Sequence, residues 1–202
     1  QSCIAANRIL VHASVADAFT ERLLEETRRL KVGPGLNGGM DVVPMIDEDA
    51  LGSALTYIQE AVDQGAQVLY GGNRLSGDGY DDGYFIEPTV LGSVHDDMRC
   101  MQEEIFAPIA PIATFETFDE AIDRANDTIY GLSAYAFTSD VSRTLRAGEE
   151  LQAGTAGIND GVPSTTNCPF GGMKQSGLGR ELGKEGMEAF LSTKHISLGI
   201  TE

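Results

Sequence analysis

The stretch that decides the fold is residues 109–159, which read IAPIATFETFDEAIDRANDTIYGLSAYAFTSDVSRTLRAGEELQAGTAGIN. The apolar, β-branched run at 109–115 predicts a buried strand, and Thr117 is a suitable N-cap for a helix over about 118–125. The same alternation of strand and helix continues at residues 134–138, 140–151 and 155–159. Strands separated by helices are typical of a mainly parallel sheet with helices on its faces.

The flanking sequence extends this alternation in both directions. Residues 8–12 predict a buried strand, and Ser14 is expected to cap a helix over about 15–30. Asp47 is expected to cap a second helix, which Gly65 ends. Further extended runs are predicted at 67–70, 85–90 and 193–199, with a helix near 180–190. We therefore predict an α/β fold with a three-layer α/β/α arrangement and a single domain over residues 1–202.

Charge excludes two classes of partner. The 202 residues contain 14 Lys and Arg against 31 Asp and Glu, a formal net charge of −17. Such a surface is unsuited to nucleic acid or to an anionic membrane, because both need cationic side chains. No apolar run is long enough to span a bilayer. The acidity fits either a salt-adapted protein or an ordinary acidic one.

The number of cysteines indicates the redox state of the cellular compartment. The chain has three cysteines, Cys3, Cys100 and Cys168. An odd, sparse count does not suit a secreted disulfide framework and fits a reducing compartment. The opening residues, Gln1-Ser2-Cys3, also lack the basic start of a signal peptide, so we expect a cytoplasmic protein.

No metal site is expected. The sequence has no CxxC or HxxxH pair, and its histidines are scattered at His12, His95 and His195. An acidic stretch contains Asp78, Asp81 and Asp82, but these lack the spacing of a calcium loop.

Cys3 is a candidate nucleophile. It lies just before a predicted buried strand, and such junctions often carry side chains that reach a cleft. A thiol is already a few per cent ionised at neutral pH, and its thiolate is a strong nucleophile. The other interpretation is a structural cysteine. A cysteine hydrolase would further need a histidine near the thiol, and nothing local in the sequence supplies one.

Two other segments could line a site. Residues 103–108, EEIFAP, place adjacent carboxylates before an aromatic ring, and a Glu suits the hydroxyl pair of a ribose. A solvated acidic turn is the alternative. Residues 169–181, PFGGMKQSGLGRE, combine Phe170 with four glycines, which allow the backbone to fold tightly around an apolar wall.

These segments together resemble the aldehyde dehydrogenase superfamily. The matching pieces follow one order along the chain: 1–3 (QSC), 103–108 (EEIFAP), 125–132 (ANDTIYGL), 157–160 (GIND) and 169–181. The resemblance is greatest to the succinate-semialdehyde dehydrogenase branch, through 3–7 (CIAAN) and 168–180.

The resemblance implies an oxidoreductase that converts an aldehyde to a carboxylic acid with NAD or NADP. Cys3 matches the nucleophile, Glu104 the residue that binds the nicotinamide ribose, and Phe106 the aromatic beside the nicotinamide. Ala107 replaces the usual glycine of this motif, and we expect the replacement to alter the conformational freedom of the backbone next to the cofactor. The family's N-terminal cofactor-binding domain is absent from residues 1–202, so we expect this chain alone to be inactive.

The resemblance also implies substrate contacts. Phe170 matches an aromatic wall of the aldehyde pocket, and Ser164 matches a serine that holds the distal carboxylate of a semialdehyde. Glu181 matches a glutamate placed in the proton relay. The family forms homo-oligomers, partly through its final strand. The alternative to an enzyme is a stand-alone, non-catalytic binding or assembly module derived from this domain.

Overall fold

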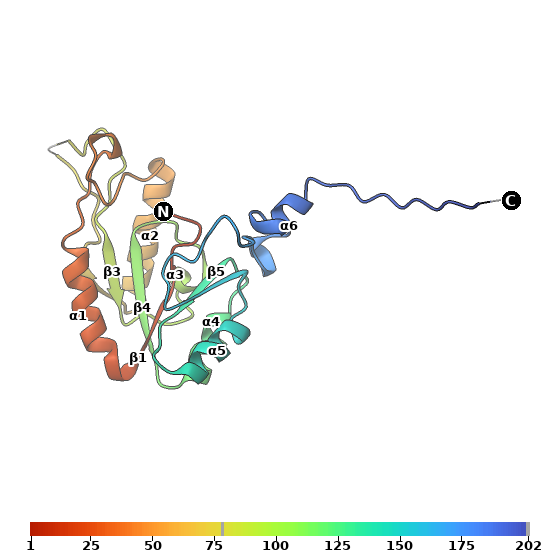
Figure 1. Cartoon of the computed structure of the whole chain (residues 1–202). Coiled ribbons are helices and arrows are strands. Elements are labelled where there is room, and N and C mark those ends of the chain that lie inside the picture. The colour runs from red at the N-terminus through yellow and green to blue at the C-terminus, as the bar shows by residue number, and fades with distance from the viewer. Residues whose placement is uncertain (78, 201–202) are drawn as a thin grey trace. The chain divides into compact units, whose positions relative to one another are not determined.

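The computed structural model describes residues 1–77 and 79–200 (Figure 1). The chain divides into two units, Gln1–Thr128 and Ile129–Glu202. A four-stranded sheet forms the centre of the first unit. Its strands are β1 (Ile9–His12), β2 (Gln67–Tyr70), β3 (Thr89–Gly92) and β4 (Ile109–Phe115). They lie in the order β1-β4-β3-β2, with β4 parallel to both β1 and β3. The edge strand β2 is antiparallel to β3, so the sheet is mainly parallel.

Helices cover both faces of this sheet. Alternate strand residues point to opposite faces, so Val90 and Ile112 pack in one cluster with helix α1 (Ala16–Thr27). Their neighbours Leu91 and Ala113 pack in a larger cluster with α2 (Glu48–Asp63). The predicted three-layer α/β/α class is thereby confirmed.

The shorter helices of this unit follow β3 and β4. Helix α3 (Arg99–Gln102), which the sequence analysis did not predict, precedes the acidic pair at 103–104. Helix α4 (Phe118–Asn126) is capped by Thr117, whose hydroxyl accepts the Glu120 N–H at 3.2 Å. Single turns of 3₁₀ helix occur at η1 (Ala13–Val15) and η2 (Gly35–Asn37).

The second unit carries a two-stranded parallel sheet. Strand β5 (Ser133–Ala136) pairs with β6 (Thr155–Ile158), and α5 (Val141–Glu150) connects them. Beyond β6 the glycine-rich segment contains only the short η3 (Lys174–Ser176) and α6 (Gly183–Glu188). The segment packs closely on the rest of the unit, because a Cβ atom at Gly154 would collide with the Gly171 carbonyl oxygen.

Two local predictions are wrong. Ser14 does not cap α1, because it belongs to η1, where its N–H and hydroxyl both contact the His12 ring at Nδ1. The strand predicted at 193–199 does not form, since the described residues from Leu191 onward have no regular structure. Of the acidic stretch, Asp78 lies outside the described residues. No helix in the described part of the chain is long and apolar enough to cross a membrane.

Candidate active site

Cys3 lies in an exposed turn just before β1, and its thiol is free. The turn is closed by the Ala5 N–H, which donates to the Ser2 carbonyl at 3.0 Å. The Gln1 side-chain amide donates to the Val43 carbonyl at 3.2 Å, which ties the start of the chain to the loop before α2. The thiol is therefore held on a defined turn and open to a reactant.

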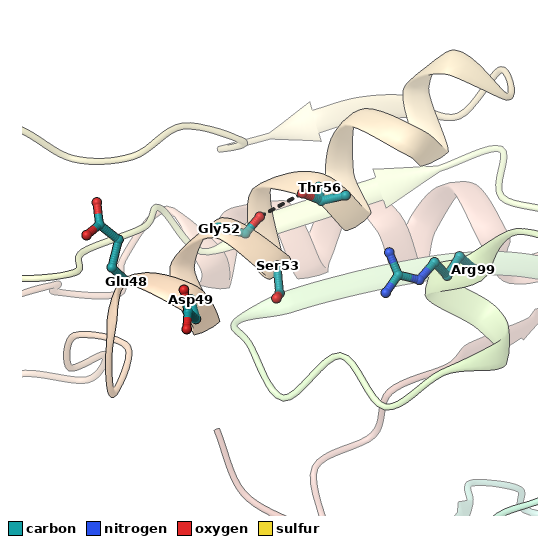
Figure 2. A pocket seen from close by; sticks show the side chains of 6 residues that line it. All are labelled: Glu48, Asp49, Gly52, Ser53, Thr56 and Arg99. Atoms are coloured by element: carbon teal, nitrogen blue, oxygen red, sulfur yellow. Dashed lines mark hydrogen bonds between the residues drawn. The ribbon is translucent and has the colours of Figure 1, made fainter.

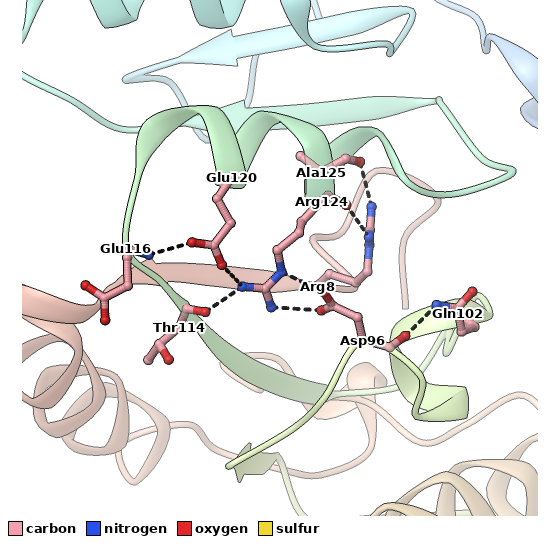
Figure 3. Close-up of polar contacts among 8 residues, drawn as sticks. All are labelled: Arg8, Asp96, Gln102, Thr114, Glu116, Glu120, Arg124 and Ala125. Atoms are coloured by element: carbon pink, nitrogen blue, oxygen red, sulfur yellow. Dashed lines mark hydrogen bonds and ion pairs between the residues drawn. The ribbon is translucent and has the colours of Figure 1, made fainter.

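The strand that follows Cys3 is anchored at its start by Arg8 (Figure 3). The Arg8 guanidinium donates to the carbonyls of Arg124 at 2.9 Å and Ala125 at 2.7 Å, at the last turn of α4. Carbonyls in the last turn of a helix need partners from outside it; the Arg124 carbonyl also accepts the Asp127 N–H at 3.3 Å, and the arginine adds to the capping of this helix end. Arg124 in turn donates to the Asp96 carboxylate from Nε at 2.6 Å and from Nη2 at 2.8 Å. This network fixes β1, and with it the base of the Cys3 turn.

The two carboxylates of the acidic pair have different surroundings. Glu103 accepts a hydrogen bond from the Tyr57 hydroxyl at 2.8 Å and pairs with Arg99 Nε at 2.9 Å, both through Oε2. The bond from Arg99 and then that from Tyr57 hold the pKa of the Glu103 carboxyl below its usual range. Glu104 is exposed and has no hydrogen bond or ion pair within the first unit's described residues. Of the two, Glu104 is the one open to a ligand.

The backbone of the same segment turns Phe106 outward. Its φ is 49°, in the left-handed region that non-glycine residues seldom adopt and that is found at functional sites. Ile105 is 5% exposed, whereas Phe106 is 47% exposed. Ala107 packs against the α2 side of the core and does not have a positive φ, so the replacement of the motif's glycine causes no backbone strain there.

A hydrogen bond brings the two predicted segments of this unit together. The Asn7 side-chain amide, four residues after Cys3, donates to the Glu103 carbonyl at 3.4 Å. The nucleophile segment and the Glu104–Phe106 segment are thus neighbours.

The second unit brings together two other predicted residues. Phe170 and Glu181 form an isolated antiparallel bridge, in which the Phe170 N–H donates at 2.8 Å and the Glu181 N–H at 2.7 Å. Phe170 is half-buried and Glu181 is exposed. Ser164 lies on the exposed stretch after β6. The role of Phe170 as a wall of the aldehyde pocket stays a prediction.

Two hollows in the surface of the first unit are lined by other residues. One, of about 400 Å³, is bordered by the first turns of α2 and by Arg99, with Glu48, Asp49 and Ser53 on the helix side (Figure 2). The other, of about 610 Å³, lies between α1 and the sheet. Neither is lined by a predicted site residue, so the hollows do not define the candidate site.

Sequence reasoning missed the residues that surround Glu103. Arg99 and Tyr57 come from α3 and α2, and Arg99 lies over the Tyr57 ring with its guanidinium carbon 4.6 Å from the ring centre. The spacing of Arg99 and Glu103, four apart along the chain, is the signal that could have indicated their ion pair. Tyr57 gave no such signal, because it is 46 residues away.

Comparison with known proteins settles the family. The chain matches the Aldehyde dehydrogenase family over residues 1–196. The chain belongs to the aldehyde dehydrogenase family. Among its relatives are the mitochondrial succinate-semialdehyde dehydrogenase of Arabidopsis thaliana, 45% identical over 98% of this chain, and the NADP(+) succinate-semialdehyde dehydrogenase GabD of Escherichia coli, 40% identical over 99%.

Solved structures of aldehyde dehydrogenases share the fold. Betaine aldehyde dehydrogenase of Staphylococcus aureus in complex with NAD+ is 41% identical, with a TM-score of 0.92 over 96% of this chain. An aldehyde dehydrogenase from Brucella melitensis is 45% identical, with a TM-score of 0.91 over 97%. The chain spans only about two-fifths of these proteins, from 37% of the Arabidopsis enzyme to 41% of GabD.

Proposed function

We propose that this aldehyde dehydrogenase chain is the catalytic part of an enzyme that oxidises an aldehyde to a carboxylic acid with NAD or NADP, with Cys3 as nucleophile. The observation that carries the proposal is the free, exposed Cys3 thiol on a segment that Asn7 joins to Glu103, next to Glu104 and Phe106. The family resemblance implies two further groups, a second hydrogen-bond donor to the substrate oxygen and a general base, and we propose that both belong to the cofactor-binding domain outside residues 1–202. Residues 1–202 alone are inactive.

The first half of the reaction takes place on Cys3. The thiolate Sγ adds to the aldehyde carbon, so that a C–S bond forms and the carbonyl π electrons move to oxygen. The Cys3 backbone N–H supports this negative oxygen. When bound, NAD or NADP accepts the hydride that leaves the same carbon, and the carbon becomes a thioester on Cys3. The oxygen of a water molecule then adds to the thioester carbon while a general base takes a proton from that water, and the C–S bond breaks so that the thiolate leaves as the acid forms.

The described residues fit a nicotinamide cofactor. The Glu104 carboxylate is exposed and can accept two hydrogen bonds from a ribose diol. The Phe106 ring is turned outward by its left-handed backbone and can pack on a flat heterocycle. These residues hold and orient the cofactor.

The substrate class that we propose is a semialdehyde such as succinate semialdehyde. Ser164 is exposed and able to donate a hydrogen bond to a distal carboxylate, and Phe170 offers an apolar wall. The two relatives named above are succinate-semialdehyde dehydrogenases. Glu181, whose backbone pairs with that of Phe170, is our proposal for a residue of the proton relay.

The chain also offers a surface for self-association. Ile196, Leu198 and Ile200 alternate with small residues and are at least 75% exposed, which is the pattern of a strand without a partner. We propose that these residues form a strand in a homo-oligomer.

The free thiols of the chain suit a reducing compartment, and we propose that this compartment is the cytoplasm.

The test is steady-state kinetics of the enzyme encoded by the complete reading frame. We expect aldehyde-dependent reduction of NAD or NADP, which Cys3→Ala abolishes and Cys168→Ala preserves. Succinate semialdehyde should be preferred over butanal, and Ser164→Ala should raise the KM of the semialdehyde about tenfold while leaving that of butanal unchanged. Normal turnover by Cys3→Ala would contradict the role of Cys3 as nucleophile. No aldehyde-dependent turnover by the wild-type enzyme would favour the binding or assembly module instead.

A further inference from the structure

Glu103 is the point at which helices α2 and α3 of the first unit meet. Its Oε2 accepts from the Tyr57 hydroxyl on α2 at 2.8 Å and pairs with Arg99 on α3 at 2.9 Å. Arg99 is itself fixed by stacking on the Tyr57 ring and by a longer contact, 3.4 Å, with Glu60. Figure 2 shows the Arg99 side chain directed from α3 toward α2.

These contacts lie immediately before the proposed cofactor contacts. Glu104 follows Glu103 directly, and Phe106 follows two residues later with its φ of 49°. Ile105, between them, is buried in the core. The segment is therefore fixed at Glu103 by polar contacts and at Ile105 by packing, and the two outward side chains project from the fixed backbone.

We propose that Glu103 is a positioning residue, held by Arg99 and Tyr57, that sets the placement of Glu104 and Phe106 toward the nicotinamide end of the cofactor. This inference rests on the proposed function. The adjacent carboxylates then have separate tasks: Glu104 contacts the cofactor, whereas Glu103 acts through the backbone and never touches it.

The surroundings of the ion pair favour positioning over stability. The Glu103 and Arg99 side chains are 47% and 42% exposed, and ion pairs this open to water add little to folding stability. Geometry is nevertheless tightly specified, because a tyrosine hydroxyl and a guanidinium nitrogen converge on a single carboxylate oxygen. Removal of these contacts should therefore alter cofactor binding more than unfolding.

The experiment compares variants of the complete enzyme in three measurements. These are the KM of NAD or NADP, the KM of the aldehyde, and the dissociation constant of NADH or NADPH from fluorescence titration. Glu103→Gln keeps the side chain's size and removes its charge. We expect this variant to raise the cofactor KM and the dissociation constant about tenfold, and to leave the aldehyde KM within about twofold of the wild-type value.

Further variants separate positioning from a general structural role. Tyr57→Phe removes one hydroxyl from a buried ring and should raise the cofactor KM by less than Glu103→Gln does. Arg99→Lys keeps the charge and should partly restore the cofactor KM that Arg99→Met raises. The double variant of Arg99→Met and Glu103→Gln should be no worse than the more affected single variant, because both remove the same pair.

Two controls and the number of active sites complete the test. Arg22→Met breaks surface ion pairs on α1, with Glu25 at 2.7 Å and Glu26 at 2.6 Å, and should leave both KM values unchanged. Glu60→Gln removes only the longer contact and should have little effect. Active sites are counted from the fraction of each variant that circular dichroism shows to be folded, and rates are expressed per folded molecule. Loss of folded protein then lowers the measured rate without changing the KM values.

Two results would contradict different claims. If the wild-type enzyme is active and both Glu103→Gln and Tyr57→Phe keep the wild-type cofactor KM, positioning by Glu103 is wrong and the proposed function stands. If the wild-type enzyme neither binds NADH or NADPH nor reduces NAD or NADP with any aldehyde, the proposed function is wrong and the positioning claim falls with it.

Discussion

The three cysteine side chains differ in exposure, and the difference controls their chemistry. Cys3 and Cys168 are exposed, whereas Cys100 is 1% exposed in the core cluster beneath α2. Burial raises the pKa of the Cys100 thiol, because the thiolate loses its hydration there. Only the two exposed thiols are therefore available as nucleophiles.

This contrast gives a prediction at the residue scale. Under native conditions iodoacetamide should modify Cys3 and Cys168, and should modify Cys100 only after urea unfolds the protein. Peptide mapping by mass spectrometry at a series of urea concentrations measures each site separately, with Cys100 as the internal control. Modification of Cys100 in the native protein at the rate of the other two would show that the core around α3 opens freely.

At the same scale, the sequence identified candidates but could not separate two of them. The run EEIFAP predicts a carboxylate for a ribose, and the resemblance favours the second glutamate. The structure distinguishes the two glutamates: the Glu103 carboxylate is bound by Tyr57 and Arg99, whereas the Glu104 carboxylate is open to a ligand. The decisive contact comes from Tyr57, 46 residues away, and so no local pattern could have predicted it.

At the scale of elements, local chemistry predicted the helix starts where a capping side chain is present. Asp47 and Thr117 accept backbone N–H bonds at the starts of α2 and α4, as expected, and Asp140 does the same at the start of α5. The prediction that Ser14 caps α1 is wrong because a 3₁₀ turn precedes the helix, and in that turn the Ser14 hydroxyl contacts the His12 ring. The strand at 193–199 has the right alternation of residues, but a strand also needs a neighbour, and no described strand of this chain pairs with it.

The cap of α4 gives a prediction about stability. Thr117→Ala should lower the free energy of unfolding by about 1 kcal/mol, because the Glu120 N–H loses its acceptor. Urea denaturation followed by circular dichroism measures the change, which should be the same at pH 7 and pH 4. No loss of stability would mean that water replaces the hydroxyl without cost.

The carboxyl group of Glu120 in the same turn should behave differently with pH. It accepts the Glu116 N–H at 2.9 Å and pairs with Arg124 at 3.0 Å (Figure 3), and these contacts lower its pKa, the backbone bond most strongly. A lowered folded-state pKa contributes stability above the unfolded value, about 4.3 for Glu, and that contribution is lost as the pH falls through the folded value.

Glu120→Gln should therefore destabilise the protein at pH 7 and approach the wild-type stability under acid conditions. Unfolding curves of both proteins between pH 7 and pH 3 measure the difference. A difference that is constant over this range would show that the carboxylate charge does not support the helix start, and Thr117→Ala is the control that should stay constant.

At the scale of the whole molecule, charge is the dominant feature. Several arginines already pair with acids, among them Arg22, Arg99, Arg124 and Arg146, yet the net charge remains −17. Excess like charge destabilises a compact state, and salt screens it. We expect the melting temperature to rise steadily from low salt to molar KCl, as differential scanning fluorimetry would record. A melting temperature that stays constant or falls would reject salt adaptation and favour an ordinary acidic protein.

The central claim is that Cys3 forms a covalent bond with the aldehyde carbon, and peptide mass spectrometry after an acid quench tests it most directly. The complete enzyme is mixed with succinate semialdehyde and NAD or NADP, and is then digested. We predict a succinyl thioester on the peptide that contains Cys3, absent without the cofactor and absent in Cys3→Ala. An acyl group on Cys168 alone, or turnover with no acyl group on any cysteine at any quench time, would contradict the account.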